Sequence, residues 1–156
     1  MKSILTLSFI LLILSSYGAT KTSVADGDWY DANNWSPAGV PVTEDSVIVN
    51  HNITIAGQTV DFGANWLIIN LGASLVSDTV FGLHGNLRVL GTVDIYWFAI
   101  GDGDSTIVNG SVYGSRYIPG NPTNINYGSI LADTLVEGDT FDNYGLFDGK
   151  ALISSS

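Results

Sequence analysis

Asn126-Tyr127-Gly128 and Asn143-Tyr144-Gly145 are the same tripeptide, placed 17 residues apart in the chain. Looser copies precede them, and each copy carries a glycine at the corresponding place. The glycines of this repeat lie at positions 72, 91, 110, 128 and 145, separated by 19, 19, 18 and 17 residues. A drifting period of this size is too short for a helical-hairpin repeat and too long for a coiled-coil heptad, but it matches one turn of a β-solenoid.

An apolar residue follows four of these glycines at the same distance, two positions on. The four residues are Val93, Val112, Ile130 and Phe147. If successive coils stack as parallel strands ~4.8 Å apart, equivalent residues lie above one another and this set forms one inward ladder. Leu87, two residues after Gly85, marks a second face of the coil. We therefore predict an all-β fold, a small single-stranded parallel β-helix with coils of about 17–19 residues and an irregular N-terminal cap.

Glycine is expected at the corners because it adopts positive φ without penalty. Asparagine beside it can hydrogen-bond through its amide up and down a stack. The alternative is an antiparallel sandwich with evenly spaced turn glycines, because sandwich strands recur every ~8–12 residues and Gly85 and Gly91 are closer together than one coil. The repeat favours the solenoid.

The first residues have the pattern of a secretory signal peptide. Lys2 gives a positive start, an apolar run follows over residues 4–14, and small residues then permit cleavage after Gly18 or Ala19. This run is too short to span a bilayer. We predict residues 1–19 as the signal peptide, 20–45 as a cap segment and 46–156 as the solenoid. The protein is then extracellular or at the cell surface, without membrane insertion.

The composition is acidic and poor in charge. The chain has 15 acidic residues against 5 Lys and Arg, a formal net charge of −10, 18 glycines and no cysteine. A chain without cysteine has no disulfides and no zinc–thiolate sites. The negative charge argues against nucleic acid and anionic membranes as partners, since both bind cationic surfaces.

A segment near the N-terminus resembles known proteins. Its residues are Asp28-Trp29, Trp35-Ser36, Gly39-Val40-Pro41 and Asp45-Ser46-Val47-Ile48-Val49. This order resembles the opening segment of many secreted bacterial surface proteins with parallel β-helix coils, and the G8 domain opens in a similar way. The Asn-x-Gly-x-apolar repeats resemble the coils of autotransporter and adhesin-like β-helices. The resemblance implies a right-handed parallel β-helix displayed outside the cell.

Tyr96-Trp97-Phe98 is the densest aromatic run in the sequence. If Tyr96 and Trp97 are exposed on a flat face, they can stack on sugar rings or contact a partner protein. Strand alternation requires some of the three to point inward, where they fill the core instead. Tyr96 and Trp97 are the candidate glycan-binding residues.

Gly101-Asp102-Gly103-Asp104-Ser105 is the best candidate for an ion site. Two carboxylates and a hydroxyl at alternate positions can surround a hard cation with oxygen, which makes Asp102 and Asp104 candidate calcium ligands. The alternative is a solvated acidic turn, because Asp-Gly is a common turn signal. We expect no other cofactor.

Polysaccharide lyases and glycosidases also use parallel β-helices, so catalysis is a rival interpretation. Such enzymes need a cationic base beside carboxylates, or two carboxyl groups ~5–9.5 Å apart. Here Arg88, Arg116 and Lys150 each stand alone in their segments, and the repeat brings Asp94 and Asp133 into poor register. We assign no catalytic residue.

The last coil stays apolar through Phe147, Leu152 and Ile153, and no capping helix or proline follows in this sequence. The strand edge of a final coil is a template for pairing with another chain. We therefore expect self-association into oligomers or fibres, or binding to another surface protein, through these three residues. The predicted function is a non-catalytic exported structural or adhesion protein. A carbohydrate-binding module ranks second, and a polysaccharide lyase or hydrolase third.

Overall fold

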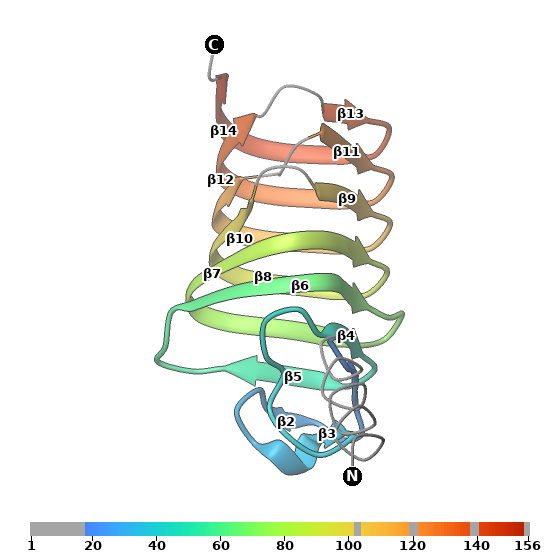
Figure 1. The fold of residues 1–156 in the computed structure, drawn as a ribbon. Helices are drawn as coiled ribbons and strands as arrows, with labels where there is room; N and C mark the ends of the chain where they lie inside the picture. Colours follow the sequence, from blue (N-terminus) through green and yellow to red (C-terminus); the bar gives the residue numbers. More distant parts are fainter. Residues whose placement is uncertain (1–17, 102–103, 119–121, 138–140, 155–156) are drawn as a thin grey trace, which may run out of the picture.

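The structure, a computed structural model, describes residues 18–101, 104–118, 122–137 and 141–154. These residues form a β-solenoid of about 5 turns around an apolar interior, which confirms the predicted fold class (Figure 1). A short 3₁₀ helix, η1 (Ala32–Asn34), follows the second strand in the chain and precedes the third. The strands are β1 (Thr20–Ser23), β2 (Gly27–Asp28), β3 (Trp35–Ser36), β4 (Ser46–Val49), β5 (Asn52–Ile55), β6 (Val60–Ile69), β7 (Ser74–Val89), β8 (Thr92–Ile100), β9 (Asp104–Val108), β10 (Ser111–Ile118), β11 (Pro122–Asn126), β12 (Ser129–Glu137), β13 (Phe141–Asn143) and β14 (Leu146–Ser154).

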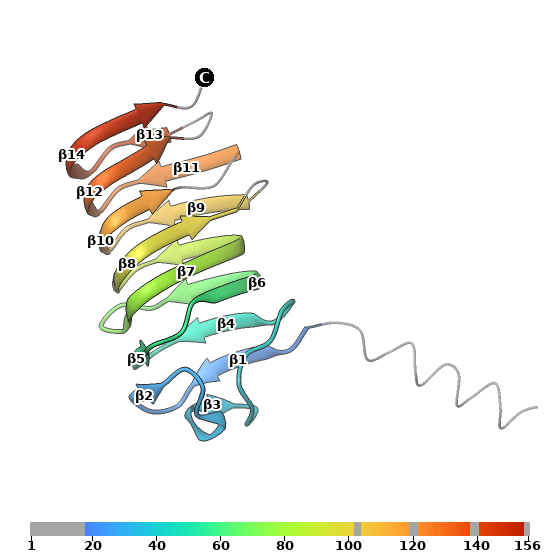
Figure 2. The ribbon, with the colours of Figure 1, turned by 90° about the vertical axis from the view of Figure 1, so that its left-hand side faces the viewer.

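Successive coils stack by parallel pairing of equivalent strands (Figure 2). The main path of the sheet runs β14-β12-β10-β8-β7-β6-β4-β1-β3, and β9, β11 and β13 stack on the last residues of β7. Strand β7 is 16 residues long because it bends around a corner of the coil without ending. Its register against β8 shifts between Ser77 and Val80, which marks that corner.

The predicted inward ladder, Val93 to Phe147, is present and extends two coils further back. Pairing places its members one above another in the order Ile53, Leu75, Val93, Val112, Ile130 and Phe147. All are buried except Phe147, which is half-buried and packs against the core. This ladder supplies one wall of the interior.

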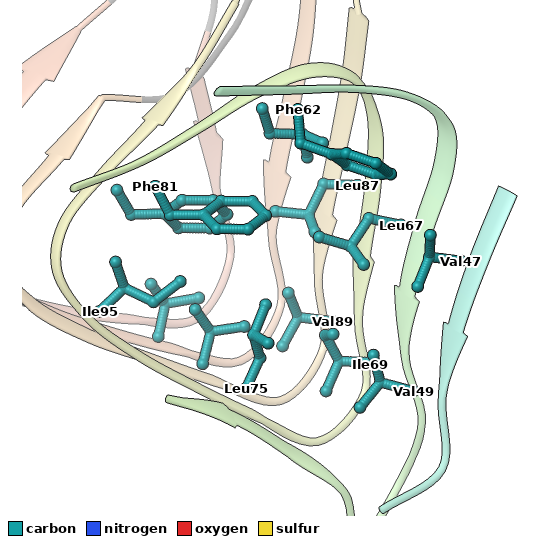
Figure 3. Close-up of a cluster of buried hydrophobic side chains, with 14 of the residues drawn as sticks. Val47, Val49, Phe62, Leu67, Ile69, Leu75, Phe81, Leu87, Val89 and Ile95 are labelled. Atoms are coloured by element: carbon teal, nitrogen blue, oxygen red, sulfur yellow. The ribbon is translucent and has the colours of Figure 1, made fainter. Parts of the chain in front are cut away.

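Two further ladders change from aliphatic to polar side chains along the solenoid axis. One contains Val47, Leu67, Leu87, Thr106 and Asn124. The other contains Val49, Ile69, Val89, Val108, Asn126 and Asn143. Figure 3 shows the aliphatic part of both, with Leu67, Leu87 and Val89 directed into the coil. Leu87 therefore lies on a second inward face, as predicted, while the C-terminal coils place polar side chains at equivalent positions.

Four of the five repeat glycines, those after Gly72, are required by space, and the predicted reason, positive φ, is wrong for these four. Only Gly72 has a positive φ, of 83°. A Cβ at Gly110 would lie 2.0 Å from the carbonyl oxygen of Gly91, and one at Gly128 would lie 2.0 Å from that of Gly110. Any side chain here would push adjacent coils apart.

Gly72 also stands one position out of register with the later glycines. Ser74 pairs with Thr92, so Ala73 occupies the place that Gly91 takes in the next coil. Leu71 and Gly72 form an extra bulge at this corner, and Leu71 is exposed. The first interval of the sequence repeat is therefore one residue longer than the structural coil.

The N-terminal end of the solenoid is covered by the cap. Strand β1 pairs in parallel with β4 on one side and antiparallel with β3 on the other, so parallel stacking begins within residues 20–45. Trp29 and Trp35 are both buried, and the indole nitrogen of Trp35 donates to the Trp29 carbonyl at 2.8 Å. The Trp29 ring meets Trp35 and Phe62 edge-on, with centroids 5.1 and 5.4 Å away. These aromatic contacts join the cap to the core.

Candidate functional site

The repeated Asn-Tyr-Gly corner forms three contacts along the solenoid axis. The Asn126 amide nitrogen donates to Asn143 Oδ1 at 2.7 Å and to the Leu146 carbonyl at 3.1 Å. Asn126 Oδ1 accepts a hydrogen bond from the backbone nitrogen of Gly128 at 3.0 Å. The rings of Tyr127 and Tyr144 are stacked, with centroids 5.4 Å apart and planes at 15°. Each element of the tripeptide thus holds the next coil.

In the last copy of the tripeptide, the same groups contact the preceding coil but have no partner on their outer side among the described residues. Asn143 uses Oδ1 as an acceptor, and in the described part of the chain its amide nitrogen has no hydrogen-bond partner. Tyr144 is 69% exposed despite its stack on Tyr127, and Leu146 beside it is 56% exposed. Beyond β13 and β14, the described residues place no further strand (Figures 1 and 2). We call Asn143, Tyr144 and the outer edges of β13 and β14 the open end.

Sequence reasoning placed the self-association site at Phe147, Leu152 and Ile153, and the structure places Phe147 differently. The Phe147 side chain points inward, above Ile130, and packs against the core. The backbone of Leu152 and Ile153 pairs with Leu135 and Val136 of β12, but their side chains lie outside the described part of the structure. Asn143 and Tyr144 are among the exposed residues at this end and were not predicted as part of the site. The repeated tripeptide is the sequence signal that could have identified them, because its last copy has no following copy to contact in this sequence.

Tyr96 and Trp97, the candidate glycan-binding residues, have different surroundings on β8. Tyr96 is 58% exposed. Trp97 stands in register with Val80 and Arg116, and the Arg116 guanidinium carbon lies 4.7 Å from the centre of the Trp97 ring. Because neighbouring coils contribute residues above and below Trp97, only Tyr96 offers an open ring for stacking on a ligand.

The candidate calcium ligands cannot be placed together. Asp102 lies outside the described residues, as does the side chain of Asp104, whose backbone begins β9. Among the residues that the structure does describe, no group of three or more His, Cys, Asp or Glu is arranged to hold a metal ion.

The acidic and basic residues weighed for catalysis stay apart. Asp94 stands in register with Tyr113, and Tyr113 in turn with Leu131, so Asp133 belongs to another row of the sheet. Arg88 is exposed, and Arg116 lies over Trp97. His84 and Asp61 form an exposed ion pair at 2.9 Å, of the kind that contributes little to stability.

A groove runs along one corner of the stack. Its volume is about 540 Å³, and no charged residue lines it. A row of hydroxyl side chains stands in register along its floor: Ser74, Thr92, Ser111 and Ser129. The row follows the solenoid axis, and Ser74 also donates to Asn52 Oδ1 at 2.8 Å.

Two ionisable groups in the cap have shifted pKa values with structural causes. The Asp26 carboxylate accepts a hydrogen bond from the Asn52 backbone nitrogen at 2.7 Å, and hydrogen bonds from Asn52 hold the pKa of Asp26 below its usual value. Partial burial raises the pKa of Tyr30, and the nearby Asp28 adds to this effect. Asp26 thereby ties the cap to β5 through its charged form.

No helix among the described residues is long and apolar enough to cross a membrane. Comparison with protein-family models, with curated proteins and with solved structures finds no match to this chain.

Proposed function

We propose that this chain is a non-catalytic structural or adhesion protein, exported to the cell surface or the extracellular space, that self-associates. The observation that carries the proposal is the contrast between the two ends of the solenoid. At the N-terminal end β1 is paired on both sides, the outer edges belong to β2 and β3, which have two residues each, and two tryptophans are buried. At the other end the backbone edges of β13 and β14 are unpaired in the described part of the chain. Such edges template pairing with another chain.

Two further features support the proposal. The N-terminal residues have the composition of a signal peptide, which directs a chain out of the cytoplasm. A solenoid interior filled with aliphatic and aromatic side chains from every coil is suited to a rigid spacer. The net charge of −10 acts against self-association at low salt, because like charges repel, and this sets the salt range over which association must be measured.

Self-association is tested by sedimentation of purified residues 20–156 over a range of concentrations and salt. We expect a species larger than the monomer whose share grows with concentration. A strict monomer at high concentration and high salt contradicts the proposal.

Export is tested by expressing the full chain and a chain that lacks residues 2–19 in the same bacterial host. We expect the full chain to reach the periplasm or medium in shortened form, and the truncated chain to stay in the cytoplasm. Equal cytoplasmic retention of both chains rejects export.

Glycan binding is a second candidate function, because Tyr96 presents an open ring on the outer face of β8. Aromatic rings of this kind stack on the apolar faces of sugars. A glycan array should then show binding that is lost in Tyr96→Ala and kept in Tyr30→Ala, a partly exposed tyrosine of the cap. Equal binding by both variants rejects the Tyr96 site.

A further inference from the structure

The open end presents groups that the rest of the stack uses for axial contacts. In every coil below, backbone nitrogens at the corner donate to the preceding coil, as Ser129 does to Gly110 and Leu146 to Gly128, at 2.9 and 2.8 Å. Strand β14 spans nine residues and β13 three. Because alternate residues of a strand direct their N–H and C=O groups to opposite sides, about half of these groups face away from the molecule.

The side chains of the last corner are self-complementary. An asparagine amide carries both donors and an acceptor, and Asn143 has its nitrogen free. One coil earlier, the Asn126 nitrogen donates to the carbonyl of Leu146, at the corner of the coil above. Asn143 offers the same donor to whichever corner lies above it. Tyr144 likewise offers an open ring face, and offset stacking of aromatic rings is favourable.

The opposite end of the solenoid offers only short edges. Strand β1 has partners on both sides, the outer edges of β2 and β3 are two residues long each, and the residues that cover the interior, Trp29 and Trp35, are buried. A head-to-tail contact, which repeats into a fibre, would therefore pair the nine-residue edge of β14 with edges of only two residues. An isologous contact uses the same surface on both copies and closes after two.

We propose that two copies of this chain join open end to open end around a two-fold axis through the Asn-Tyr-Gly corner. In this arrangement Tyr144 of one copy lies over Tyr144 of the other. Strand β13 of each copy lies antiparallel to the first residues of β14 in the other copy. Asn143 then donates to the partner's corner, as Asn126 does within one chain. This inference rests on the proposed self-association and specifies its geometry.

Charge sets the conditions under which the dimer forms. Asp142 and Asp148 are exposed at the open end, so the contact brings four carboxylates near one another. Salt screens their repulsion, with a Debye length of about 10 Å at 0.1 M. Higher salt therefore strengthens this dimer.

Disulfide trapping tests the arrangement, because the chain contains no cysteine and a single introduced cysteine is unique. The proposed two-fold axis sets Tyr144 directly over its counterpart, and a disulfide bridges Cα atoms that are about 4.4–6.8 Å apart. Under mild oxidation we expect Tyr144→Cys to form a covalent dimer and Ala38→Cys, exposed in the cap, to stay monomeric. Equal cross-linking of the two variants overturns the proposed geometry.

Sedimentation of a matched pair of charge variants tests the role of Asn143. Asn143→Asp removes the free donor in both copies and adds charge, so the dimer Kd should rise at least about tenfold. Asn109→Asp makes the same change at an exposed corner within the stack and should leave the Kd unchanged. Species that grow beyond the dimer reject the closed contact but leave the proposed self-association standing. A strict monomer rejects both.

Discussion

The lower and upper coils of this solenoid fill the same interior positions with different chemistry. In the ladder that begins at Val47 the next members are Leu67 and Leu87, and then the position passes to Thr106 and Asn124. The ladder that begins at Val49 changes in the same way, from aliphatic side chains to Asn126. All of these residues are buried. The fold has therefore exchanged one source of stability for another without changing its backbone.

The exchange is possible because a parallel stack sets each side chain directly above its equivalent. An aliphatic side chain is stabilised wherever water is excluded, whatever its neighbour. A buried amide needs a partner in the next coil, and Asn126 has one in Asn143. The upper coils should thus depend on their neighbours more than the lower coils do. Four measurements test this contrast.

Leu87→Ala should have the largest effect. Leu87 is fully buried between Leu67 and Thr106, and truncation of such a leucine costs about 2–5 kcal/mol. Urea unfolding of residues 20–156 measures the loss. A cost below that of Asn126→Ala would show that the lower coils do not rely more on burial than the upper coils.

Asn126→Ala should cost about 1–3 kcal/mol, because it removes the hydrogen bonds that this buried side chain donates to Asn143 Oδ1 and to the Leu146 carbonyl of the next coil. The backbone nitrogen of Gly128 loses one of its two acceptors and keeps the carbonyl of Val108 at 3.0 Å. Asn143→Ala is the matched control, since that side chain is exposed and makes one hydrogen bond within the chain. Equal unfolding free energies for the two variants would contradict the idea that the upper coils depend on hydrogen bonds between neighbouring coils.

Thr106→Val should stabilise the protein by about 1 kcal/mol. The Thr106 hydroxyl is buried and has no hydrogen-bond partner among the residues that the structure describes, so folding removes it from water without compensation. Valine keeps the shape and extends the aliphatic part of the ladder by one coil. Thermal unfolding reports the sign, and a lower Tm for Thr106→Val would mean that the hydroxyl has a stabilising contact.

Acid should loosen the cap, with the smallest effect of the four. The folded-state pKa of Asp26 lies below its ordinary value of 3.8, so its charged form stabilises the fold above that pH. This contribution is lost as the pH falls through the lower folded-state pKa. The protection factor of the Asn52 backbone amide against hydrogen exchange should fall there in the wild type, and Asp26→Asn should show a low protection factor already at pH 6. Identical acid profiles for the two proteins would contradict this role.

The sequence was sufficient to predict the stack because its repeat has a strict steric cause. Gly110, Gly128 and Gly145 each lie against the carbonyl of the preceding repeat glycine, so no other residue fits without displacing the backbone. The apolar residue two positions after each glycine is then fixed in direction. That is why the ladder from Val93 to Phe147 could be predicted without any knowledge of tertiary structure.

Features at bends could not be predicted in the same way. The corner within β7 has no glycine at the register shift after Ser77, so no sequence signal marks it. This shift brings Trp97 into register with Val80 and Arg116, whereas Tyr96 faces solvent. Parallel pairing of β1 with β4 was also missed, since residues 20–23 have no periodic pattern. Pairing between distant segments depends on which edges remain free, and local sequence does not encode that.

The in-register corners also have a genetic consequence. Asn126 pairs with Asn143 and Ser129 with Leu146, each 17 residues further on. Deleting residues 127–143 would join Asn126 to Tyr144 and regenerate Asn-Tyr-Gly at the junction, and duplicating them would do the same. Deletion or duplication of this 17-residue unit would therefore change the length of the protein by one whole turn, ~4.8 Å along the axis. The number of 17-residue repeats in the sequence thus sets the length of the solenoid.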